Sequence, residues 1–380
     1  MYIPRTIVNR IKEKLFTGKV IVLIGARQVG KSTSFSRLNQ ELGLNALILN
    51  CDEPEVRTLL ESPSSAEIEL LIGKHNAVII DEAQRVKDIG LTLKRIYESH
   101  KDVQLLVTGS SSLMLHDQIN EPLTGRKYEY FLYPIASQEI IESDGGLLWE
   151  KQLLEPRLIY GSYPEVLTSL NNAKELLINL ADSYLYKDIL SLENIKRPEL
   201  LNKLLIALAL QVSSEVSYNE IAKTIGTDSK TVEKYISLLE QCHVVFRLGA
   251  LSRNIRNELS KSKKIYFYDN GIRNAVIQNF APLSLRQDAG ALWENFFISE
   301  RIKFNHYRGH HANVYFWRTT AQQEIDYIEE CDGQFTLFEI KWNPKAKVHF
   351  PKNFLETYNV SQSIVVTPEN YLDYLIPQTK

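Results

Sequence analysis

The stretch from Gly25 to Ser32 constrains the fold of this chain more than any other. It reads G-A-R-Q-V-G-K-S and follows the apolar run Val20–Ile24, so it matches G-x-x-x-x-G-K-[ST] where that motif must lie. In such a loop the glycines let successive backbone N–H groups point at phosphate oxygens. Lys31 would reach the β- and γ-phosphates, and Ser32 would hold Mg²⁺. The candidate nucleotide-binding residues are Gly25, Ala26, Arg27, Gln28, Val29, Gly30, Lys31, Ser32 and Thr33.

The surroundings of this loop favour phosphate binding over the alternative, a chance glycine-rich turn. A buried strand precedes the loop, and a helix that begins near Lys31 would direct the positive end of its dipole at the anion. The sequence therefore predicts a nucleotide site at this βα turn.

The stretch Ala77–Glu82 is the second strong signal. Four apolar residues end in two acids, which is the form of a Walker B strand. Asp81 would bind Mg²⁺ through water and support Ser32, and Glu82 would polarise the attacking water. A plain strand with a solvated acidic end is the alternative for this stretch alone. Because it follows Lys31 by 50 residues, the two motifs form a pair that is far more specific than either one.

The next apolar strand, Gln104–Ser112, ends in polar residues. In nucleotide-hydrolysing folds of this kind, the strand beside Walker B often offers a polar side chain to the γ-phosphate. Thr108 and Ser110 are the candidates for this role, and a structural turn explains each of them equally well.

Arg126 precedes a further strand, Tyr128–Tyr133. It could act as a finger that neutralises charge on the transferred phosphoryl group, in cis or from a neighbouring subunit. An ordinary surface arginine is the equal alternative.

The alternation of apolar strands with helices predicts a parallel sheet covered on both faces. Ligands of such sheets bind at the carboxyl ends of the strands, where all these motifs fall. After Pro134 the strand rhythm stops, and Asp144–Gly146 is a candidate hinge. Residues 148–211 are expected to be helical, with Ala173–Leu190 and Glu199–Gln211 as examples.

Residues 217–247 have the pattern of a winged helix-turn-helix. The expected helices are Tyr218–Ile225 and Ser229–Cys242, and the expected wing begins at Val244 and returns at Ile265–Phe267.

The charges of this region leave its partner open. Lys230 and Lys234 would face outward, but Glu233 and Glu240 share their helix and dilute a contact with DNA. Direct DNA binding and a packing or regulatory role both remain, and the charge pattern favours the second. The basic residues expected in the wing are Arg247, Arg253, Arg256, Lys261, Lys263 and Lys264.

The last part of the chain returns to an αβ pattern with a candidate nuclease site. Asp326 is followed, after twelve intervening residues, by Glu339 and Lys341 in an E-x-K triplet, which is the spacing of the PD-(D/E)XK nuclease core. Asp326 and Glu339 would bind Mg²⁺, Lys341 would steady the attacking hydroxide, and Glu294 would add a ligand from a helix. An ordinary hairpin with an exposed acid–lysine pair is the alternative. The expected strands are Tyr315–Trp317, Glu324–Ile328 and Phe335–Lys341.

Composition limits the partners and the compartment. The net charge is −2, so a nucleic-acid site would have to be a local patch. The cysteines, Cys51, Cys242 and Cys331, lie far apart, which argues against a zinc site or disulfides and suits a reducing compartment. No early apolar run is long enough for a signal peptide or a membrane span, so a cytoplasmic protein without a membrane partner is expected.

Short motifs of one recognisable set are spread over nearly the whole chain: Gly25–Ser32, Asp52–Pro54, Ile79–Gln84, Thr108–Ser111, Gly125–Arg126, Pro134, Gly161–Pro164, Tyr186–Asp188, Trp293–Asn295, Glu324–Asp326 and Glu339–Lys341. With these motifs the chain resembles the bacterial and archaeal AAA-type ATPases that join an ATPase domain to a C-terminal domain of unknown function. The resemblance implies ATP as the ligand, since a phosphate loop alone does not read the base. It also implies a winged helix and a restriction-endonuclease-like end. Ser162 departs from the family pattern, which commonly has a second glycine, so the turn there is expected to differ.

Together the patterns predict an α/β protein of four segments. An AAA/RecA-like P-loop domain with a parallel sheet is expected in residues 1–140 and a helical lid or linker in 141–212. A winged helix-turn-helix is expected in 213–285 and an α/β restriction-endonuclease-like, PD-(D/E)XK domain in 286–380. The expected function is Mg²⁺-dependent ATP hydrolysis coupled to the C-terminal module, with DNA and further copies of the chain as partners. The alternative is an ATP-driven signalling switch whose C-terminal half binds a protein.

Overall fold

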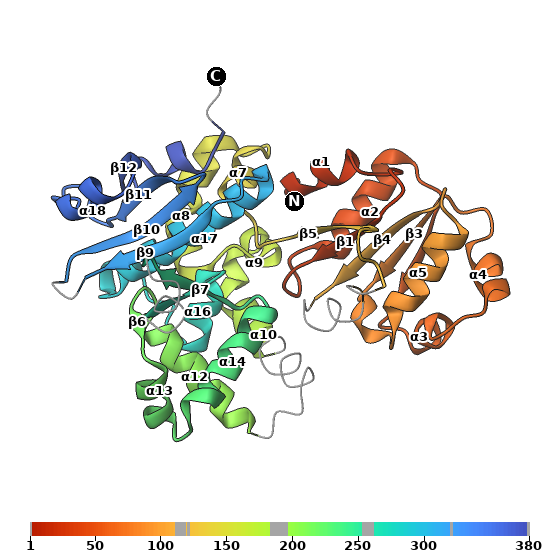
Figure 1. Cartoon of the computed structure of the whole chain (residues 1–380), viewed down its shortest axis with the longest axis horizontal. Helices are drawn as coiled ribbons and strands as arrows, with labels where there is room; N and C mark the ends of the chain where they lie inside the picture. Colours follow the sequence, from red (N-terminus) through yellow and green to blue (C-terminus); the bar gives the residue numbers. More distant parts are fainter. Residues whose placement is uncertain are drawn as a thin grey trace. The chain divides into compact units, whose positions relative to one another are not determined.

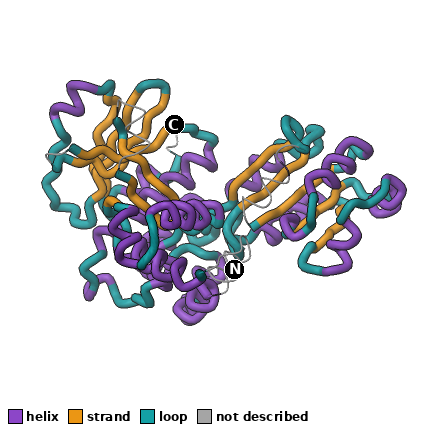
Figure 2. Tube along the Cα trace, turned by 60° about the horizontal axis from the view of Figure 1, so that its bottom comes forward, coloured by secondary structure: helices purple, strands orange, loops and turns teal. Residues whose placement is uncertain are grey.

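The computed structural model describes residues 2–110, 119, 122–182, 197–252, 262–319 and 322–377. The chain forms two compact units. We call residues 4–134 with 241–243 the N-terminal unit, and residues 1–3, 135–240 and 244–380 the C-terminal unit. Each unit is built around its own sheet (Figure 1), and Figure 2 shows the strands of each sheet side by side with helices packed against them.

The N-terminal unit contains a five-stranded sheet in the order β2-β3-β4-β1-β5. All its strand pairings are parallel, as the alternating pattern predicted. The strands are β1 (Val20–Ile24), β2 (Ala46–Asn50), β3 (Ala77–Asp81), β4 (Gln104–Gly109) and β5 (Lys127–Phe131). The helices are α1 (Thr6–Lys12), α2 (Lys31–Leu42), α3 (Pro54–Leu60), α4 (Ser65–Ile72) and α5 (Ile89–Ser99), with a short 3₁₀ helix η1 (Ala83–Arg85) after β3.

Burial explains why apolar runs form the central strands of this sheet. Every residue of β1 and β4 is buried, and so are the first four residues of β3. Successive side chains of a strand point to opposite faces, so both faces of the central sheet must be covered. On one face, Val20, Val22 and Ile24 of β1 share a core with side chains of α3, α4 and α5. This burial leaves the carboxyl ends of β1, β3 and β4 as the places where polar residues appear.

The C-terminal unit combines helices with a seven-stranded mixed sheet in the order β12-β11-β10-β9-β7-β8-β6. The helices are α7 (Ser137–Ile141), α8 (Gly146–Tyr160), α9 (Pro164–Thr168), α10 (Ala173–Ala181), α12 (Pro198–Leu210), α13 (Tyr218–Ile225), α14 (Ser229–Gln241), α16 (Asn270–Val276), α17 (Ala289–Arg308) and α18 (Lys352–Thr357). The strands are β6 (Glu215–Val216), β7 (Val245–Ala250), β8 (Lys263–Phe267), β9 (Asn313–Arg318), β10 (Glu324–Cys331), β11 (Gln334–Ile340) and β12 (Val360–Val366).

A short parallel pairing joins the two halves of this sheet. Gly249 and Ala250 of β7 pair with Tyr315 and Phe316 of β9. The hairpin β7–β8 and the meander β9–β10–β11 are antiparallel, and β12 runs parallel to β11. The strands that follow the helix pair α13–α14 therefore share one sheet with the strands near the end of the chain.

The core of the C-terminal unit lies between α17 and this sheet (Figure 1). Trp293 and Phe297 of α17 are fully buried and pack in one cluster with Tyr266 of β8, Tyr327 of β10 and Phe338 of β11. Helix α17 thus contacts strands from both halves of the sheet, and it carries Glu294 next to this core.

Two predicted elements, β1 and α13, have the expected bounds. Strands β6 and β12 were not predicted. Some predicted residues lie outside the part of the chain that the structure describes, namely Ser111, Ser112, Tyr186–Asp188, Arg253, Arg256 and Lys261.

Candidate functional site

The loop between β1 and α2 has the backbone of an anion-binding nest. Gln28 and Gly30 both adopt the left-handed conformation, with φ values of 60° and 97°. Lys31, the first residue of α2, is only 4% exposed, and its Nζ donates to the carbonyl oxygens of Gly25 (3.0 Å) and Ala26 (2.9 Å). An ammonium group, a helix N-terminus and a curled backbone thus converge here, and this combination fits a phosphate.

Gly25 is required by a close approach of two backbone segments. A Cβ atom at this position would lie 2.2 Å from the carbonyl oxygen of Leu132. The Leu132 N–H in turn donates to the carbonyl oxygen of Ile24 at 2.7 Å. The segment after β5 therefore holds the start of the loop in place.

Ser32 and Asp81 meet at the carboxyl ends of the strands, as the paired motifs predicted. The Ser32 hydroxyl donates to both carboxylate oxygens of Asp81, at 2.9 and 2.7 Å. Thr108 Oγ1 also donates to Asp81. A hydroxyl and a carboxylate are oxygen ligands of the kind that Mg²⁺ prefers, so this pair fits the ion.

Glu82 is held in an unusual backbone conformation by three neighbours. Its φ is 52°, in the left-handed region, and its N–H donates to Thr108 Oγ1 at 3.1 Å. Its carboxylate accepts hydrogen bonds from Gln84 Nε2 (2.6 Å) and Ser110 Oγ (3.0 Å). Thr108 and Ser110, both predicted as γ-phosphate sensors, are thus brought to the two acids of β3.

Gln84 is a site residue that the sequence reasoning missed. It lies on η1, is 8% exposed, and its Nε2 also donates to Ser110 Oγ at 2.8 Å. Its side-chain oxygen Oε1 is buried and has no hydrogen-bond partner among the residues that the structure describes. The signals in the sequence were its position two residues after Glu82 and its place at the end of the Ile79–Gln84 motif.

A cavity of about 480 Å³ opens beside the loop. Ser32, Thr33 and Asp81 line it together with Ser36 and Arg37 of α2. Thr33 is exposed, so the start of α2 is accessible along this side. Arg27, Gln28 and Val29 complete the loop between Ala26 and Gly30.

Arg126 does not lie with the other predicted residues. It precedes Lys127, which pairs with Val20 at the amino end of β1, whereas the phosphate loop follows Ile24 at the carboxyl end. Its guanidinium donates to the carbonyl oxygen of Pro122 (3.2 Å) and pairs with Glu98 (3.3 Å). Arg126 therefore lies at the amino ends of the strands, whereas the phosphate loop lies at their carboxyl ends. This position contradicts a role for Arg126 in cis.

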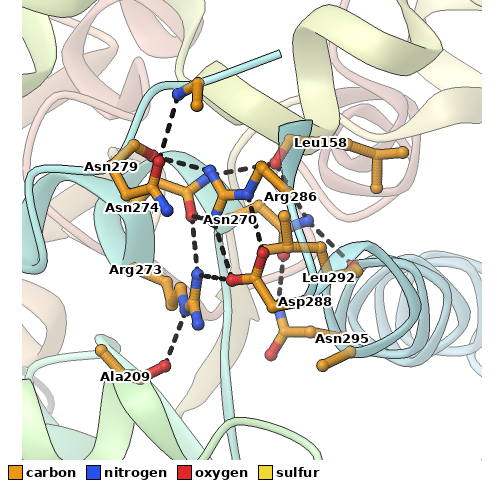
Figure 3. Close-up of polar contacts among 12 residues, drawn as sticks. Leu158, Ala209, Asn270, Arg273, Asn274, Asn279, Arg286, Asp288, Leu292 and Asn295 are labelled. Carbon is orange, nitrogen blue, oxygen red and sulfur yellow. Dashed lines mark hydrogen bonds and ion pairs between the residues drawn. The ribbon is translucent and has the colours of Figure 1, made fainter. Parts of the chain in front are cut away.

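In the C-terminal unit, a buried polar network fixes α16 and α17 (Figure 3). Arg273 and Arg286 both bind Asp288, which precedes α17, with the shortest contact at 2.6 Å. Asn295 of α17 accepts from the N–H of Phe267 (2.7 Å) and donates to its carbonyl oxygen (3.0 Å). These two hydrogen bonds to the end of β8 set the position of the neighbouring Glu294 against that strand.

The Gly161–Pro164 motif belongs to a second buried network in this unit. A Cβ at Gly161, whose φ is 75°, would lie 1.9 Å from Asp269 Oδ1. Ser162 donates its N–H to Asp269 (2.6 Å) and accepts from the buried Arg157 (2.9 Å) through its hydroxyl. The motif therefore has a structural role, and the serine that departs from the family pattern is used as a hydrogen-bond acceptor.

The predicted nuclease residues of β10 and β11 come together. The register of these antiparallel strands, which pairs Tyr327 with Phe338, sets Asp326 opposite Glu339. Lys341 Nζ lies 2.9 Å from Asp326 Oδ2 and 2.7 Å from Glu339 Oε2. The E-x-K triplet thus places its acid and its lysine on one face, as the period of a strand predicted.

Glu294 meets a lysine and a tyrosine of β8. Its Oε1 accepts from Tyr266 OH at 2.6 Å and lies 3.3 Å from Lys264 Nζ. The same Nζ lies 2.6 Å from Glu324 of β10. Glu324 was not predicted as a site residue. Its position two residues before Asp326 could have indicated that the two side chains share one face of the strand.

Lys264, one of the basic residues expected in the wing, lies on β8 of the hairpin β7–β8, and its side chain is buried. Lys264 is 2% exposed, because the strands β6 and β7 flank β8 and α17 covers its face. Arg247, another predicted wing residue, binds Glu240 through its Nε at 2.8 Å. Lys230 and Lys234 of α14 are exposed, as predicted.

Burial and charge shift the titration of this cluster. Burial raises the pKa of Glu294 to about 7, although Lys264 acts in the opposite direction. Burial, followed by repulsion from Asp326, raises the pKa of Glu339 to about 7. Burial alone would lower the pKa values of Lys264 and Lys341, but the surrounding carboxylates raise both. Among the described residues, no group of three or more His, Cys, Asp or Glu side chains is placed to hold a metal ion.

Comparison with protein families identifies three consecutive segments. The family described as "AAA domain" matches residues 17–141. A "Domain of unknown function (DUF8612)" matches residues 151–283, and a "Domain of unknown function (DUF4143)" matches residues 289–377.

Relatives of similar length are uncharacterized proteins of bacteria and archaea. One from Mycobacterium tuberculosis is 25% identical over 339 residues, which cover 87% of this chain and 72% of that protein. One from Haemophilus influenzae is 22% identical and covers 93% of this chain and 90% of that protein. One from Methanocaldococcus jannaschii is 23% identical and covers 78% of this chain and 74% of that protein.

Solved structures show only a distant similarity. The Holliday junction branch migration motor RuvB of Thermotoga maritima is 15% identical, with a TM-score of 0.34 over 64% of this chain and 90% of that chain. A Bacteroides Pif1 bound to single-stranded DNA is 18% identical, with a TM-score of 0.26 over 41% of this chain and 50% of that chain. Scores this low do not establish a common fold.

In the described part of the chain, no helix has the length and apolar character that crossing a membrane requires. The N-terminal motifs, the parallel sheet and the order of the matched domains agree with one another. The chain therefore carries an AAA domain followed by two domains of unknown function, and it is similar over most of its length to uncharacterized proteins of bacteria and archaea.

Proposed function

We propose that this protein is an Mg²⁺-dependent ATPase whose active site lies in the N-terminal unit. The observation that carries the proposal is the convergence of Lys31, Ser32, Asp81 and Glu82 at the carboxyl ends of β1 and β3. The choice of ATP over other nucleotides rests on the AAA domain.

The residues of the site have separate roles in this proposal. The N–H groups of the loop and the Lys31 ammonium bind the β- and γ-phosphates. Ser32 and Asp81 hold Mg²⁺, which when bound neutralises charge on the phosphate oxygens. Glu82 takes a proton from water as the water attacks the γ-phosphorus, and the bond between that phosphorus and the bridging oxygen breaks, so ADP leaves.

The polar neighbours of the two acids complete the site. Thr108 orients Asp81, and Ser110 and Gln84 orient Glu82. Thr108 or Ser110 would sense the γ-phosphate. Arg126 lies at the amino ends of the strands, away from the phosphate loop of its own chain. A finger role would therefore require Arg126 of a neighbouring copy of the chain.

The test is steady-state ATP hydrolysis by the wild type, Lys31→Ala and Lys74→Ala. Lys74 is an exposed lysine of the same unit and serves as the matched control. Lys31→Ala should lower kcat/KM by at least about 100-fold, since it removes the charge that binds the transferred phosphoryl group. Lys74→Ala should match the wild type. Normal hydrolysis by Lys31→Ala would contradict the proposal.

We infer that hydrolysis is coupled to the C-terminal unit as a winged-helix and restriction-endonuclease-like module. The pair α13–α14 followed by the hairpin β7–β8 supports the first part. The meander β9–β10–β11 under α17, with Asp326, Glu339 and Lys341 on one face, supports the second. Nucleic acid is the partner that such a module would engage.

A second candidate, an ATP-driven switch whose C-terminal half binds a protein, is favoured by one observation. Lys264 and Arg247, two of the basic residues expected in the wing, are engaged with glutamates of the same unit. Hydrolysis measured with and without duplex and single-stranded DNA separates the two. Stimulation by DNA supports the nucleic-acid module, and a rate indifferent to DNA supports the switch.

A further inference from the structure

We propose that Lys264 and Lys341 fill the cation positions of the C-terminal carboxylate cluster, so that this module works without a divalent metal ion. The inference concerns the C-terminal unit alone and does not depend on nucleotide hydrolysis. It replaces the Mg²⁺ that the spacing of Asp326, Glu339 and Lys341 led us to expect.

The first internal cation is Lys264. Its Nζ lies 2.6 Å from Glu324 of β10 and 3.3 Å from Glu294 of α17, so it bridges acids from two elements. The ring of Phe316 is 5.4 Å from the same nitrogen. With two carboxylates and an aromatic ring around it and only 2% of the residue exposed, this ammonium is held inside the protein.

The second cation is Lys341, which is half-buried. Its Nζ binds Asp326 and Glu339 at 2.9 and 2.7 Å. The N–H of Ile340 also donates to Asp326 Oδ2, at 2.8 Å. The two acids that a nuclease core would offer to a metal therefore already have hydrogen-bond donors.

Each ammonium group of the cluster lies between two carboxylates. Lys264 bridges Glu294 and Glu324, and Lys341 bridges Asp326 and Glu339. Mg²⁺ needs near-octahedral oxygen ligands at about 2.0–2.1 Å. An ion on Asp326 and Glu339 would have to displace the Lys341 ammonium, and an ion on Glu294 and Glu324 would have to displace the buried Lys264 ammonium, which leaves that charge unpaired.

The backbone of Lys264 is fixed within the sheet. Lys264 pairs with Leu248 of β7 on one side of the strand and with Glu215 of β6 on the other. Three residues further on, Asn295 clamps the end of β8 at Phe267. The side chain of Lys264 therefore starts from a fixed position within the sheet, where the residue is only 2% exposed.

Binding of Mn²⁺, followed by electron paramagnetic resonance of the full-length protein, tests the proposal. All samples carry Asp81→Asn so that the nucleotide site contributes no ion. Lys264→Met removes the internal cation. Lys263→Met is the matched control, because Lys263 is the preceding residue of β8 and points to the other face, 3.9 Å from Glu233.

Lys264→Met should bind Mn²⁺ with a Kd of about 1 mM or tighter, the range of weak carboxylate sites. The background protein and Lys263→Met should bind at least about tenfold more weakly. Adding Asp326→Asn to Lys264→Met should abolish the gained signal. Lys264→Gln, which keeps a polar side chain of similar reach, repeats the test if the methionine variant does not fold.

Two results would overturn the proposal. One is Mn²⁺ binding by the background protein at 1 mM or tighter that disappears on Asp326→Asn. The other is a folded Lys264→Met or Lys264→Gln protein that gains no Mn²⁺ binding. Mn²⁺ binding by the background protein is measured without a change at Lys264. This result can therefore overturn the proposal even if both Lys264 variants are unstable.

Discussion

The conformation of Glu82 is the residue-scale feature on which the proposed chemistry depends most. A non-glycine residue in the left-handed region costs roughly 1 kcal/mol or more. Here the hydrogen bonds from Gln84 and Ser110 to the carboxylate, and from the Glu82 N–H to Thr108, hold the strained turn. Strain that surrounding contacts maintain in this way is typical of functional sites.

Replacing Gln84 by leucine should therefore lower kcat while leaving the KM for ATP nearly unchanged. Gln84 holds the carboxylate of Glu82 and has no hydrogen bond to the phosphate loop among the described residues. Misplacing a catalytic group by about 1 Å can cost up to about 100-fold in rate, so we expect a 10- to 100-fold loss, roughly. Arg85→Ala, at the adjacent exposed residue, is the control. Equal kcat values for Gln84→Leu and the wild type would refute a positioning role.

Glu294 gives a prediction about pH. Because its pKa is raised from the usual 4.5 to about 7, the folded protein binds more protons than the unfolded chain between these values. The free energy of unfolding should therefore fall as the pH rises from 4.5 to 7. Glu294→Gln should remove on the order of 1–3 kcal/mol of this fall, and the remainder belongs to groups such as Glu339.

Tryptophan fluorescence during urea unfolding can measure this effect in one unit. All four tryptophans of the chain, at positions 149, 293, 317 and 342, lie in the C-terminal unit. Glu175→Gln, at an exposed glutamate of α10, is the control. If Glu294→Gln and Glu175→Gln give parallel curves between pH 4.5 and 7, the raised pKa is contradicted.

At the scale of elements, strands were predictable where burial is continuous. The run that became β1 has the predicted bounds, and β3 and β4 lie within theirs, because apolar residues fill them and polar residues follow them. Strand β12 was missed because Ser361, Gln362 and Ser363 interrupt its apolar pattern. Its partner β11 supplies the pairing from a distant part of the sequence.

The burial of the Lys264 side chain could not be predicted for a related reason. A lysine in a short strand between exposed-looking basic residues is normally solvated. Only the pairing of β8 with strands on both sides and the packing of α17 make that position internal. Nothing in the local sequence contains this information.

The link between α17 and β8 gives the prediction at this scale. Asn295→Ala should lower the free energy of unfolding of the C-terminal unit by about 2–4 kcal/mol, because it leaves the buried N–H and C=O of Phe267 without their partner. Asn219→Ala, at an exposed position of α13, should change it by less than about 0.5 kcal/mol. Tryptophan-monitored urea unfolding of both variants measures the difference. Equal stability of the two variants would show that the clamp contributes nothing.

At the scale of the whole molecule, the sequence predicted the order of the parts better than their connections. The phosphate loop, the helical stretch and the late αβ region all occur in the predicted order. The pairing of Gly249 and Ala250 with Tyr315 and Phe316 makes one sheet of strands from the two last predicted segments. A contact between residues so distant along the chain leaves no local periodicity to detect.

The candidate nucleotide site was predictable because its chemistry is local. Lys31 and Ser32 follow the phosphate loop directly at the start of α2, and Asp81 and Glu82 are consecutive at the end of β3, so each motif is contiguous in the sequence. Gln84 and Lys264 have roles that depend on three-dimensional neighbours and were found only in the structure.

Turnover and binding of ATP by Glu82→Gln, compared with the wild type, test the central claim most directly. The substitution removes the base and keeps the shape of the side chain, while Lys31, Ser32 and Asp81 remain to hold the nucleotide and Mg²⁺. The account predicts that a fluorescent ATP analogue binds both proteins with a similar Kd and that kcat falls by at least about 100-fold in the variant. If Glu82→Gln hydrolyses ATP at the rate of the wild type, the assignment of this site as an ATPase centre with Glu82 as its base is contradicted.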